Sequence, residues 1–286
     1  MTTPLDTLRQ AIQRVCSEEQ SQWLAEAIDG LRPGTTADEL ATLIARARRR
    51  VGRQPLGESA EPIDTPDGPL AIARWEAGDA ARVALLLAAI AASGGSGIVK
   101  EAYRLGDDAE NTALIRGLSL YGDGEALRET ALNAGRTNSL LLLAALTLHN
   151  PYPAAHYADH EFNQMVLKAL FLGLNIDAVQ GLERRGNPEL SQMCEDYIDE
   201  RLAAGRSVPA DIWLALAPHA SPAGLERLQQ ALQDDSPEHR YYAARATGRR
   251  PPTPALSAAI ERQLQHETDP RIRRQLLDTS GKQTIS

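Results

Sequence analysis

Hydrophobic residues recur every three or four positions along most of the chain, the spacing that places them on one face of a helix. The pattern begins with Leu5, Leu8, Ile12 and Val15 and continues through residues 23–31. Thr36 and Glu39 have the spacing of a capping box, which predicts that a third helix starts there. We therefore expect residues 1–51 to form a small N-terminal helical unit.

The helical pattern stops between residues 52 and 69. This stretch contains Pro55, Gly57, Pro62, Pro66, Gly68 and Pro69. No continuous helix tolerates so many proline and glycine residues. We predict a linker over residues 52–69, followed by a helical-repeat domain over residues 70–286.

The repeat domain is expected to open with a helix over residues 75–92 that is apolar enough to be covered on most of its sides. Further helices are predicted over residues 98–105, 109–120, 124–132 and 137–148. Because the links between them are short, consecutive helices should be antiparallel neighbours, the elementary unit of an α-solenoid.

A repeat with a period of 33 residues lies near the C-terminus, where residues 235–240 align with residues 268–273. Each copy has a proline, Pro237 or Pro270, followed three residues later by Arg240 or Arg273. The pattern resembles HEAT-type repeats, in which the proline opens a helix and the arginine braces the neighbouring repeat. The prediction is an all-α fold: a right-handed α-solenoid of antiparallel, HEAT-like helix pairs.

The amino-acid composition favours a helical fold, and the net charge disfavours nucleic acid as a partner. The apolar residues are mostly Ala and Leu, and aromatic residues make up only 4% of the chain, which favours helices over sheets. A formal net charge of -8 opposes binding to nucleic acid. The longest apolar runs, residues 83–92 and 140–148, are shorter than the roughly 20 residues that span a membrane. Without a signal-peptide pattern at the N-terminus, the expected location is the cytoplasm, with no membrane insertion.

One polar segment in the middle of the chain, residues 149–164, carries three of the six histidines. Pro151 and Pro153 predict an extended turn, and Asp159 is expected to cap a helix that runs to Leu172. The candidate pocket residues are His149, Asn150, Tyr152, His156, Tyr157, His160, Glu161, Asn163, Gln164 and Lys168.

The predicted helix after Asp159 has polar groups on one face together with Leu167 and Phe171. A solvent-facing surface is normally rich in charged residues, so this face is expected to be covered. Two interpretations stay open. The polar groups form a structural network that ties the proline-containing turn to its neighbours, or they line a pocket for binding or catalysis.

His156 and His160 are four residues apart, a spacing at which two histidines of one helix can bind a metal ion. Pro153 places His156 before the helix, so the two imidazoles need not project together. Iron enzymes built on HEAT-type repeats use several facing His-Glu pairs, whereas this chain has only the dipeptides at 160–161 and 266–267. No catalytic triad is visible either. We predict neither a metal nor a cofactor.

The run over residues 149–171 resembles the signature stretch of the EboA family of bacterial proteins, and Trp75, residues 81–82 and residues 85–87 are similar to that family as well. The family is named for a gene cluster, and its own activity is not established. Other products of the cluster look like a membrane prenyltransferase, a sugar-phosphate cyclase and metal-dependent hydrolase-like proteins. In cyanobacteria the cluster is associated with export of a sunscreen-pigment precursor. By association, the resemblance implies an accessory or binding protein.

The leading hypothesis is therefore a non-catalytic helical-repeat accessory protein of a secondary-metabolite (ebo-type) pathway, which binds a partner protein or a pathway intermediate. The alternative is an enzyme that acts on a small metabolite in a polar pocket around His160, Asn163, Gln164 and Lys168. In that version His160 is the general acid or base and Lys168 holds an anion.

Overall fold

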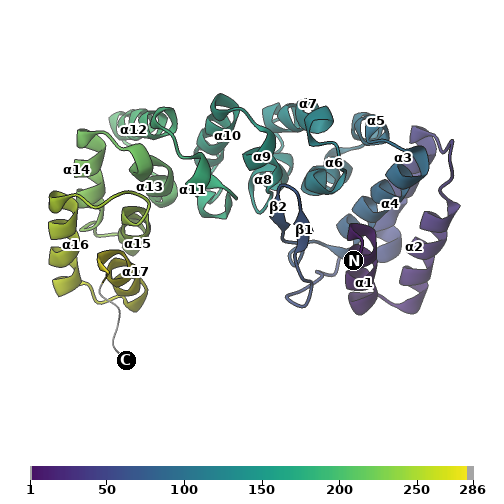
Figure 1. Cartoon of the computed structure of the whole chain (residues 1–286), viewed down its shortest axis with the longest axis horizontal. Helices are drawn as coiled ribbons and strands as arrows, with labels where there is room; N and C mark the ends of the chain where they lie inside the picture. The colour runs from purple at the N-terminus through teal and green to yellow at the C-terminus, as the bar shows by residue number, and fades with distance from the viewer. Residues whose placement is uncertain (1, 282–286) are drawn as a thin grey trace. The chain divides into compact units, whose positions relative to one another are not determined.

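The computed structural model describes residues 2–281, which are almost entirely helical. Seventeen α-helices, four short 3₁₀-helices and one two-stranded hairpin follow one another along this part of the chain (Figure 1). The predicted all-α class is confirmed. By their contacts the residues fall into two compact units, called unit 1 and unit 2, which divide between Tyr157 and Ala158. The domain boundaries at residues 51 and 69 stay a prediction.

Unit 1 contains α1 (Pro4–Val15), α2 (Glu18–Gly30), α3 (Ala37–Val51), β1 (Ile63–Thr65), β2 (Gly68–Leu70), α4 (Ala77–Ser93), α5 (Gly97–Leu105), α6 (Asp108–Arg116), η1 (Leu118–Leu120), α7 (Gly124–Arg136), α8 (Leu140–Thr147) and α9 (Tyr152–His156). Unit 2 contains α10 (Asp159–Phe171), η2 (Ile176–Ala178), α11 (Leu182–Arg185), α12 (Pro188–Ala203), η3 (Ala210–Ile212), α13 (Trp213–Leu216), η4 (Ala217–His219), α14 (Pro222–Ala231), α15 (Pro237–Thr247), α16 (Pro254–His266) and α17 (Pro270–Ser280).

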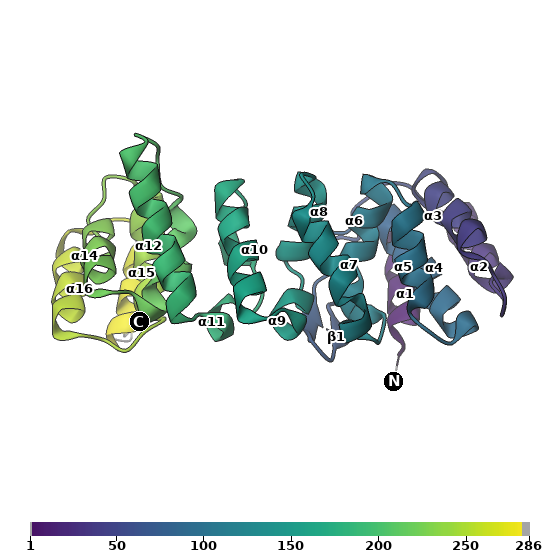
Figure 2. The same ribbon diagram turned by 90° about the horizontal axis from the view of Figure 1, so that it is seen from above.

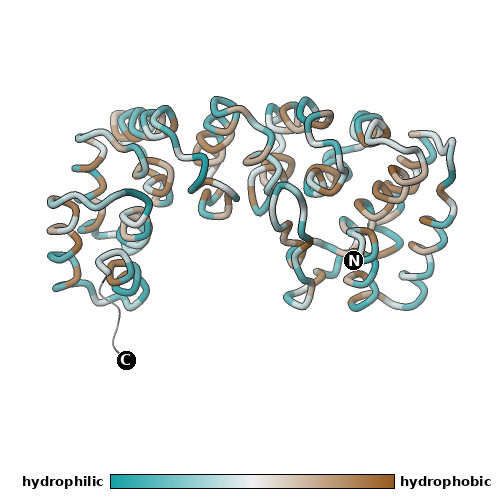
Figure 3. The backbone as a smooth tube through the Cα atoms, viewed as in Figure 1, coloured by the Kyte–Doolittle hydropathy of each residue, from teal (hydrophilic) through white to brown (hydrophobic). Residues whose placement is uncertain are grey.

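Side-chain caps set many of the helix starts. Thr36 Oγ1 accepts the Glu39 N–H (3.3 Å), and the Glu39 carboxylate accepts the Thr36 N–H (2.8 Å), so the predicted capping box is confirmed. Ser139 Oγ accepts the Leu142 N–H (3.4 Å), and α8 consequently begins at Leu140 instead of residue 137. In Figure 3 hydrophobic and hydrophilic stretches alternate along the helices, as expected when each helix buries one side.

Helix α4 is the centre of unit 1. It packs against α1, α2, α3, α5 and α6 (Figures 1 and 2), and every residue from Ala77 to Ala89 except Leu87 is buried. The prediction that this helix is covered on most sides is confirmed. Gly78 allows the start of α4 to approach the end of α3, because a Cβ there would lie 2.7 Å from the carbonyl oxygen of Gly52.

A buried charge cluster joins α4 to its neighbours. Asp79 lies between two arginines, with Oδ1 3.4 Å from Arg82 Nη1 and Oδ2 2.5 Å from Arg116 Nη1. Arg82 also donates to the carbonyl oxygens of Ile44 in α3 (3.2 Å) and Ala109 in α6 (2.9 Å). One side chain therefore connects three helices, and we call Asp79, Arg82 and Arg116 the charge trio.

The segment rich in proline and glycine is not helical, as predicted, but it contains a hairpin that the sequence pattern did not predict. Strands β1 and β2 pair antiparallel, with Ile63 opposite Leu70. Leu56, Ile63 and Leu70 are at most 5% exposed. The Leu56 N–H donates to the Trp75 carbonyl (2.9 Å), which holds the beginning of the segment against the residues just before α4.

Unit 2 ends in two helix pairs, α14 with α15 and α16 with α17. Pro237 and Pro270 each occupy the first position of a helix, as predicted. Arg240 Nε donates to Glu267 (2.8 Å), the residue that precedes the next repeated segment. Among the helices of residues 2–281, none combines the length and hydrophobicity needed to cross a bilayer.

The charge trio gives the first testable prediction. Arg82→Leu removes the hydrogen bonds to Ile44 and Ala109 and leaves Asp79 with a single cationic partner. We expect the free energy of unfolding to fall by about 3 kcal/mol, measured by urea denaturation. Arg49→Leu on the exposed side of α3 is the control and should change it by less than about 0.5 kcal/mol. Equal effects of the two substitutions would contradict the role assigned to the trio.

Candidate functional site

The ten predicted site residues do not form one cluster within either unit. His149, Asn150, Tyr152, His156 and Tyr157 belong to unit 1, and the other five belong to unit 2. The two groups are therefore described separately.

Asn150 is a structural residue at the end of α8. It is only 2% exposed, and its Nδ2 donates to the carbonyl oxygens of Ile115 and Ala145, both at 3.0 Å. Its Oδ1 accepts the Tyr152 N–H at 3.1 Å. Both amide hydrogens are used, so the side chain fixes the turn and has none left to donate to a ligand.

His149 has an unusual backbone. Its φ of 56° makes it the one non-glycine residue of positive φ among residues 2–281. The position follows the C-cap of α8, where glycine is the usual choice. Burial lowers the pKa of His149 below its ordinary value, and the positive charge of Arg74 lowers it further. A non-glycine residue at such a position carries backbone strain, and strain of this kind clusters at binding sites.

Tyr152 and His156 hold the hairpin against α7 and α9. The Tyr152 hydroxyl donates to the Gly124 carbonyl (2.5 Å), and the two rings lie 4.5 Å apart. His156 Nε2 lies 2.9 Å from Asp67 Oδ1 in the turn between β1 and β2. Gly124 leaves room for the imidazole, since a Cβ there would lie 2.1 Å from the ring. These contacts are architectural.

In unit 2, α10 begins differently from the prediction. Ala158, not Asp159, is the N-cap, and its N–H donates to the Glu161 carboxylate at 2.8 Å. Asp159 occupies the first helical position and accepts a hydrogen bond from Arg185 at 2.9 Å. The expected cap was wrong because Glu161, three residues after the cap, satisfies the free N–H group. The helix ends at Phe171, one residue early.

Asn163 is the one polar residue of this face of α10 that is buried. Asn163 is fully buried and exchanges hydrogen bonds with the Asn187 amide (2.9 and 3.1 Å), and it also donates to Glu189 (3.0 Å). His160, Gln164 and Phe171 are exposed, and Lys168 is half-buried. The prediction that this whole face is covered was therefore wrong. Polar residues beside Leu167 and Phe171 gave the impression of a buried face, but those neighbours are not buried.

The region with the geometry of a ligand site is a cavity of about 380 Å³ in unit 1, at the end of α8. Residues that follow β2, among them Ala73 and Trp75, form part of its lining. Its apolar lining includes Leu70, Ala73, Trp75, Ala144, Ala145 and Leu148. Charged and titratable side chains also line it: Glu58, Arg74, Arg116 and His149. A mostly apolar cleft of this size with a few polar groups is typical of small-molecule sites.

Of the ten predicted site residues, only His149 and Asn150 line this cavity. The remaining residues of the lining were not among the predicted site residues. Glu58 lies in the segment interpreted as a linker, and Arg74 and Trp75 directly precede α4. Arg116 is the last residue of α6. The one available signal was Trp75, which the family resemblance singles out.

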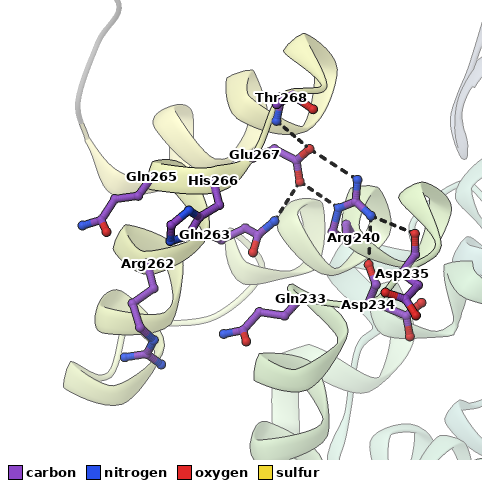
Figure 4. Close-up of a pocket in the computed structure, with 10 residues that line it drawn as sticks. All are labelled: Gln233, Asp234, Asp235, Arg240, Arg262, Gln263, Gln265, His266, Glu267 and Thr268. Atoms are coloured by element: carbon purple, nitrogen blue, oxygen red, sulfur yellow. Dashed lines mark hydrogen bonds and ion pairs between the residues drawn. The ribbon is translucent and has the colours of Figure 1, made fainter.

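A larger cavity of about 580 Å³ lies between the last helices of unit 2 (Figure 4). Its walls are polar, and its main charges neutralise each other. Arg240 binds Glu267 and the carbonyl oxygens of Asp234 and Asp235, and Glu267 also accepts from Gln263 (2.8 Å) and the Thr268 N–H (3.1 Å) (Figure 4). Because Arg240 and Glu267, the ion pair of this lining, already satisfy each other, the smaller cavity of unit 1 is the better candidate for a ligand.

No group of three or more His, Cys, Asp or Glu side chains in residues 2–281 is arranged to hold a metal ion. His156 ends α9 and His160 lies in α10, on different helices.

Fold and cavity together define a helical protein with a ligand-sized, partly cationic cavity. The chain belongs to the EboA family, described as metabolite traffic proteins, and the match covers residues 5–217. The whole of unit 1 from Leu5 onward lies within the match, and the helix pairs after residue 217 lie outside it. Searches of curated proteins and of solved structures found no match.

Gly124→Ala should displace the His156 ring and break its contact with Asp67. Forcing a methyl group into this site should lower the free energy of unfolding by about 1–3 kcal/mol, measured by urea denaturation. Gly95→Ala is the matched control, because no atom lies within 4 Å of the added Cβ. Faster hydrogen exchange at Ile63 and Leu70 should accompany the loss in Gly124→Ala. Unchanged exchange there would show that His156 does not hold the hairpin.

Asn163→Ala separates the structural interpretation of α10 from the functional one. It removes the hydrogen bonds that the fully buried Asn163 amide makes with Asn187 and Glu189, so we expect a loss of about 2 kcal/mol in unfolding free energy. Gln164→Ala, one residue away and exposed, should cost less than about 0.5 kcal/mol. Thermal denaturation followed by circular dichroism measures both, and a stable Asn163→Ala would refute the network.

Proposed function

We propose that this chain is a non-catalytic accessory protein of a secondary-metabolite (ebo-type) pathway, that it acts in the cytoplasm, and that it binds a pathway intermediate in the cavity of unit 1. The observation that carries the proposal is the cavity itself. It joins an apolar wall to charged side chains, and it lies within residues 5–217, the part that matches a family of metabolite traffic proteins. Of the two kinds of partner considered, the cavity favours an intermediate over a protein.

Three of the five polar groups that line the cavity, Arg74, Arg116 and Asn150, suit binding better than proton transfer. Arg74 and Arg116 keep their charge at neutral pH and cannot serve as general acids or bases. The amide of Asn150 is already hydrogen-bonded. The enzymatic alternative needs His160, Asn163, Gln164 and Lys168 to act together, but Asn163 is committed to Asn187 and Glu189. These hydrogen bonds leave Asn163 unable to take part in the proposed catalysis, so the enzymatic alternative loses one of its four groups.

We further propose that the helix pairs form a right-handed α-solenoid with HEAT-like pairs over residues 222–280. Two equivalent contacts support this. Arg240 Nη1 donates to the carbonyl oxygen of Asp234 (2.8 Å), and Arg273 Nη1 donates to that of Glu267 (3.0 Å). In both cases the acceptor lies six residues earlier, as the period of 33 requires.

Native mass spectrometry tests the binding function. The purified chain is incubated with a metabolite extract of its own host, passed through a desalting column and weighed intact. We expect a small-molecule adduct on the wild type that is absent from Ala144→Phe, which fills the cavity from α8. Gln164→Ala in unit 2 is the control and should keep the adduct.

The same samples test whether the chain is a catalyst. The released molecule should have the mass that it has in the extract, with or without protein. An adduct that persists in a folded Ala144→Phe would contradict the assignment of the cavity. Conversion of the molecule to a product by the purified chain would contradict a non-catalytic role.

A further inference from the structure

We propose that the ligand of the unit 1 cavity is a small organic anion, a carboxylate or a phosphate monoester with an apolar body. Arg74 and Arg116 hold its charged group, and Trp75 and Leu148 contact its apolar part. The inference rests on the proposed binding function and adds the chemical class of the ligand.

The charge trio leaves uncompensated positive charge at the cavity. One carboxylate, Asp79, faces two guanidinium groups, and the other groups that Arg82 contacts, the carbonyls of Ile44 and Ala109, carry no negative charge. The buried trio therefore keeps one net positive charge. Arg116, whose side chain is 30% exposed, is the member that reaches the cavity lining. An anion there would complete the pairing that Asp79 alone cannot supply.

Arg74 supplies a second cation to the cavity lining. It is exposed at the cavity, and no carboxylate of the described residues forms an ion pair with it. Glu58 is the one acidic residue of the lining, and it is exposed as well. Two arginines against one glutamate leave the lining positive, although the chain as a whole has a net charge of -8. The contrast in sign marks the cavity as a local site for an anion.

His149 adds a hydrogen-bonding group beside Arg74. Burial and the neighbouring Arg74 charge lower its pKa, which favours the neutral ring in the absence of ligand. A bound anion would oppose both causes and favour the imidazolium. The other charged groups that line the same cavity are Arg74, Arg116 and Glu58.

The rest of the lining requires an apolar body. Ala73, Ala144 and Leu148 in the lining are half-buried, so part of their apolar surface is open to the cavity, and Trp75 beside them is 5% exposed. A free inorganic anion would contact only the arginines and leave this surface hydrated. A ligand with a short hydrocarbon portion removes that surface from water, which adds about 0.8 kcal/mol for each buried CH₂ group.

Isothermal titration with six-carbon probes tests the inference. Hexanoate and hexyl phosphate supply the two anionic groups, hexan-1-ol and hexylamine are the neutral and cationic analogues, and inorganic phosphate lacks the apolar body. We expect at least one six-carbon anion to bind about tenfold more tightly than hexan-1-ol. Hexylamine and inorganic phosphate should bind more weakly than that anion. Whichever of hexanoate and hexyl phosphate binds more tightly identifies the head group.

Two pairs of variants locate the binding. Arg74→Gln should weaken the anionic probes about tenfold and leave hexan-1-ol unchanged. Arg50→Gln makes the same charge change on the exposed end of α3 and should have no effect. Glu58→Gln should tighten binding of anions. His149→Gly suits the positive φ and should fold as stably as the wild type, while binding anions more weakly.

The outcomes separate this inference from the proposed function. If hexan-1-ol binds in the cavity, is lost in Ala144→Phe, and no anion binds more tightly, the binding site stands and the anionic class is wrong. If no probe binds, or if Ala144→Phe leaves every affinity unchanged, both are overturned. Equal effects of Arg74→Gln and Arg50→Gln would show a general charge effect and would also overturn the inference.

Discussion

Unit 1 depends on a single buried carboxylate that faces two buried or half-buried arginines. Asp79 lies on α4, the helix covered by most of its neighbours, and Arg82 extends the connection to α3 and α6 through two main-chain carbonyl groups. A buried charge is tolerated only when it is paired and hydrogen-bonded. The trio meets this condition for stability but has one more positive than negative charge, and its member Arg116 lines the cavity. The packing of the helices and the character of the candidate site thus share one cause.

The segment between α3 and α4, residues 52–76, contributes side chains to the cavity lining. Its N–H groups bind carbonyl groups at its own end, for example Gly57 to Ala73 at 3.0 Å, so it returns to the helical body and covers the end of α8. The hairpin within it is attached by Asp67 to His156. A segment without helical propensity therefore forms part of the lining of the candidate site, in keeping with the general placement of binding residues on irregular segments of a rigid scaffold.

Local sequence rules predicted much of the helical structure. The apolar spacing located α1 to α8 to within a few residues, the capping box at Thr36 was found, and Pro237 and Pro270 do begin helices. All these features depend on residues three or four positions apart. The hairpin was missed because proline and glycine were interpreted only as helix breakers, and because its stability comes from burial of Ile63 and Leu70 against distant residues.

The candidate site was less predictable for the same reason. The segment from His149 was recognised as polar and unusual, but what each side chain does depends on partners far away in the chain. Asn150 binds Ile115, His156 binds Asp67, and Asn163 binds Asn187. Residue type indicated that these groups need partners, not which partners they have. Arg116 and Arg74 gave no signal of their own, because a cavity is a property of the packed chain.

The pKa of His149, measured by NMR titration of the ring protons with and without hexyl phosphate or hexanoate, tests the central claim most directly. Without ligand the account predicts a pKa below the ordinary value of about 6.5. With the anion bound next to Arg74 and Arg116, it predicts a clear rise in that pKa. A His149 pKa that is the same with and without a saturating anion would contradict the claim that this cavity is the site where the ligand binds.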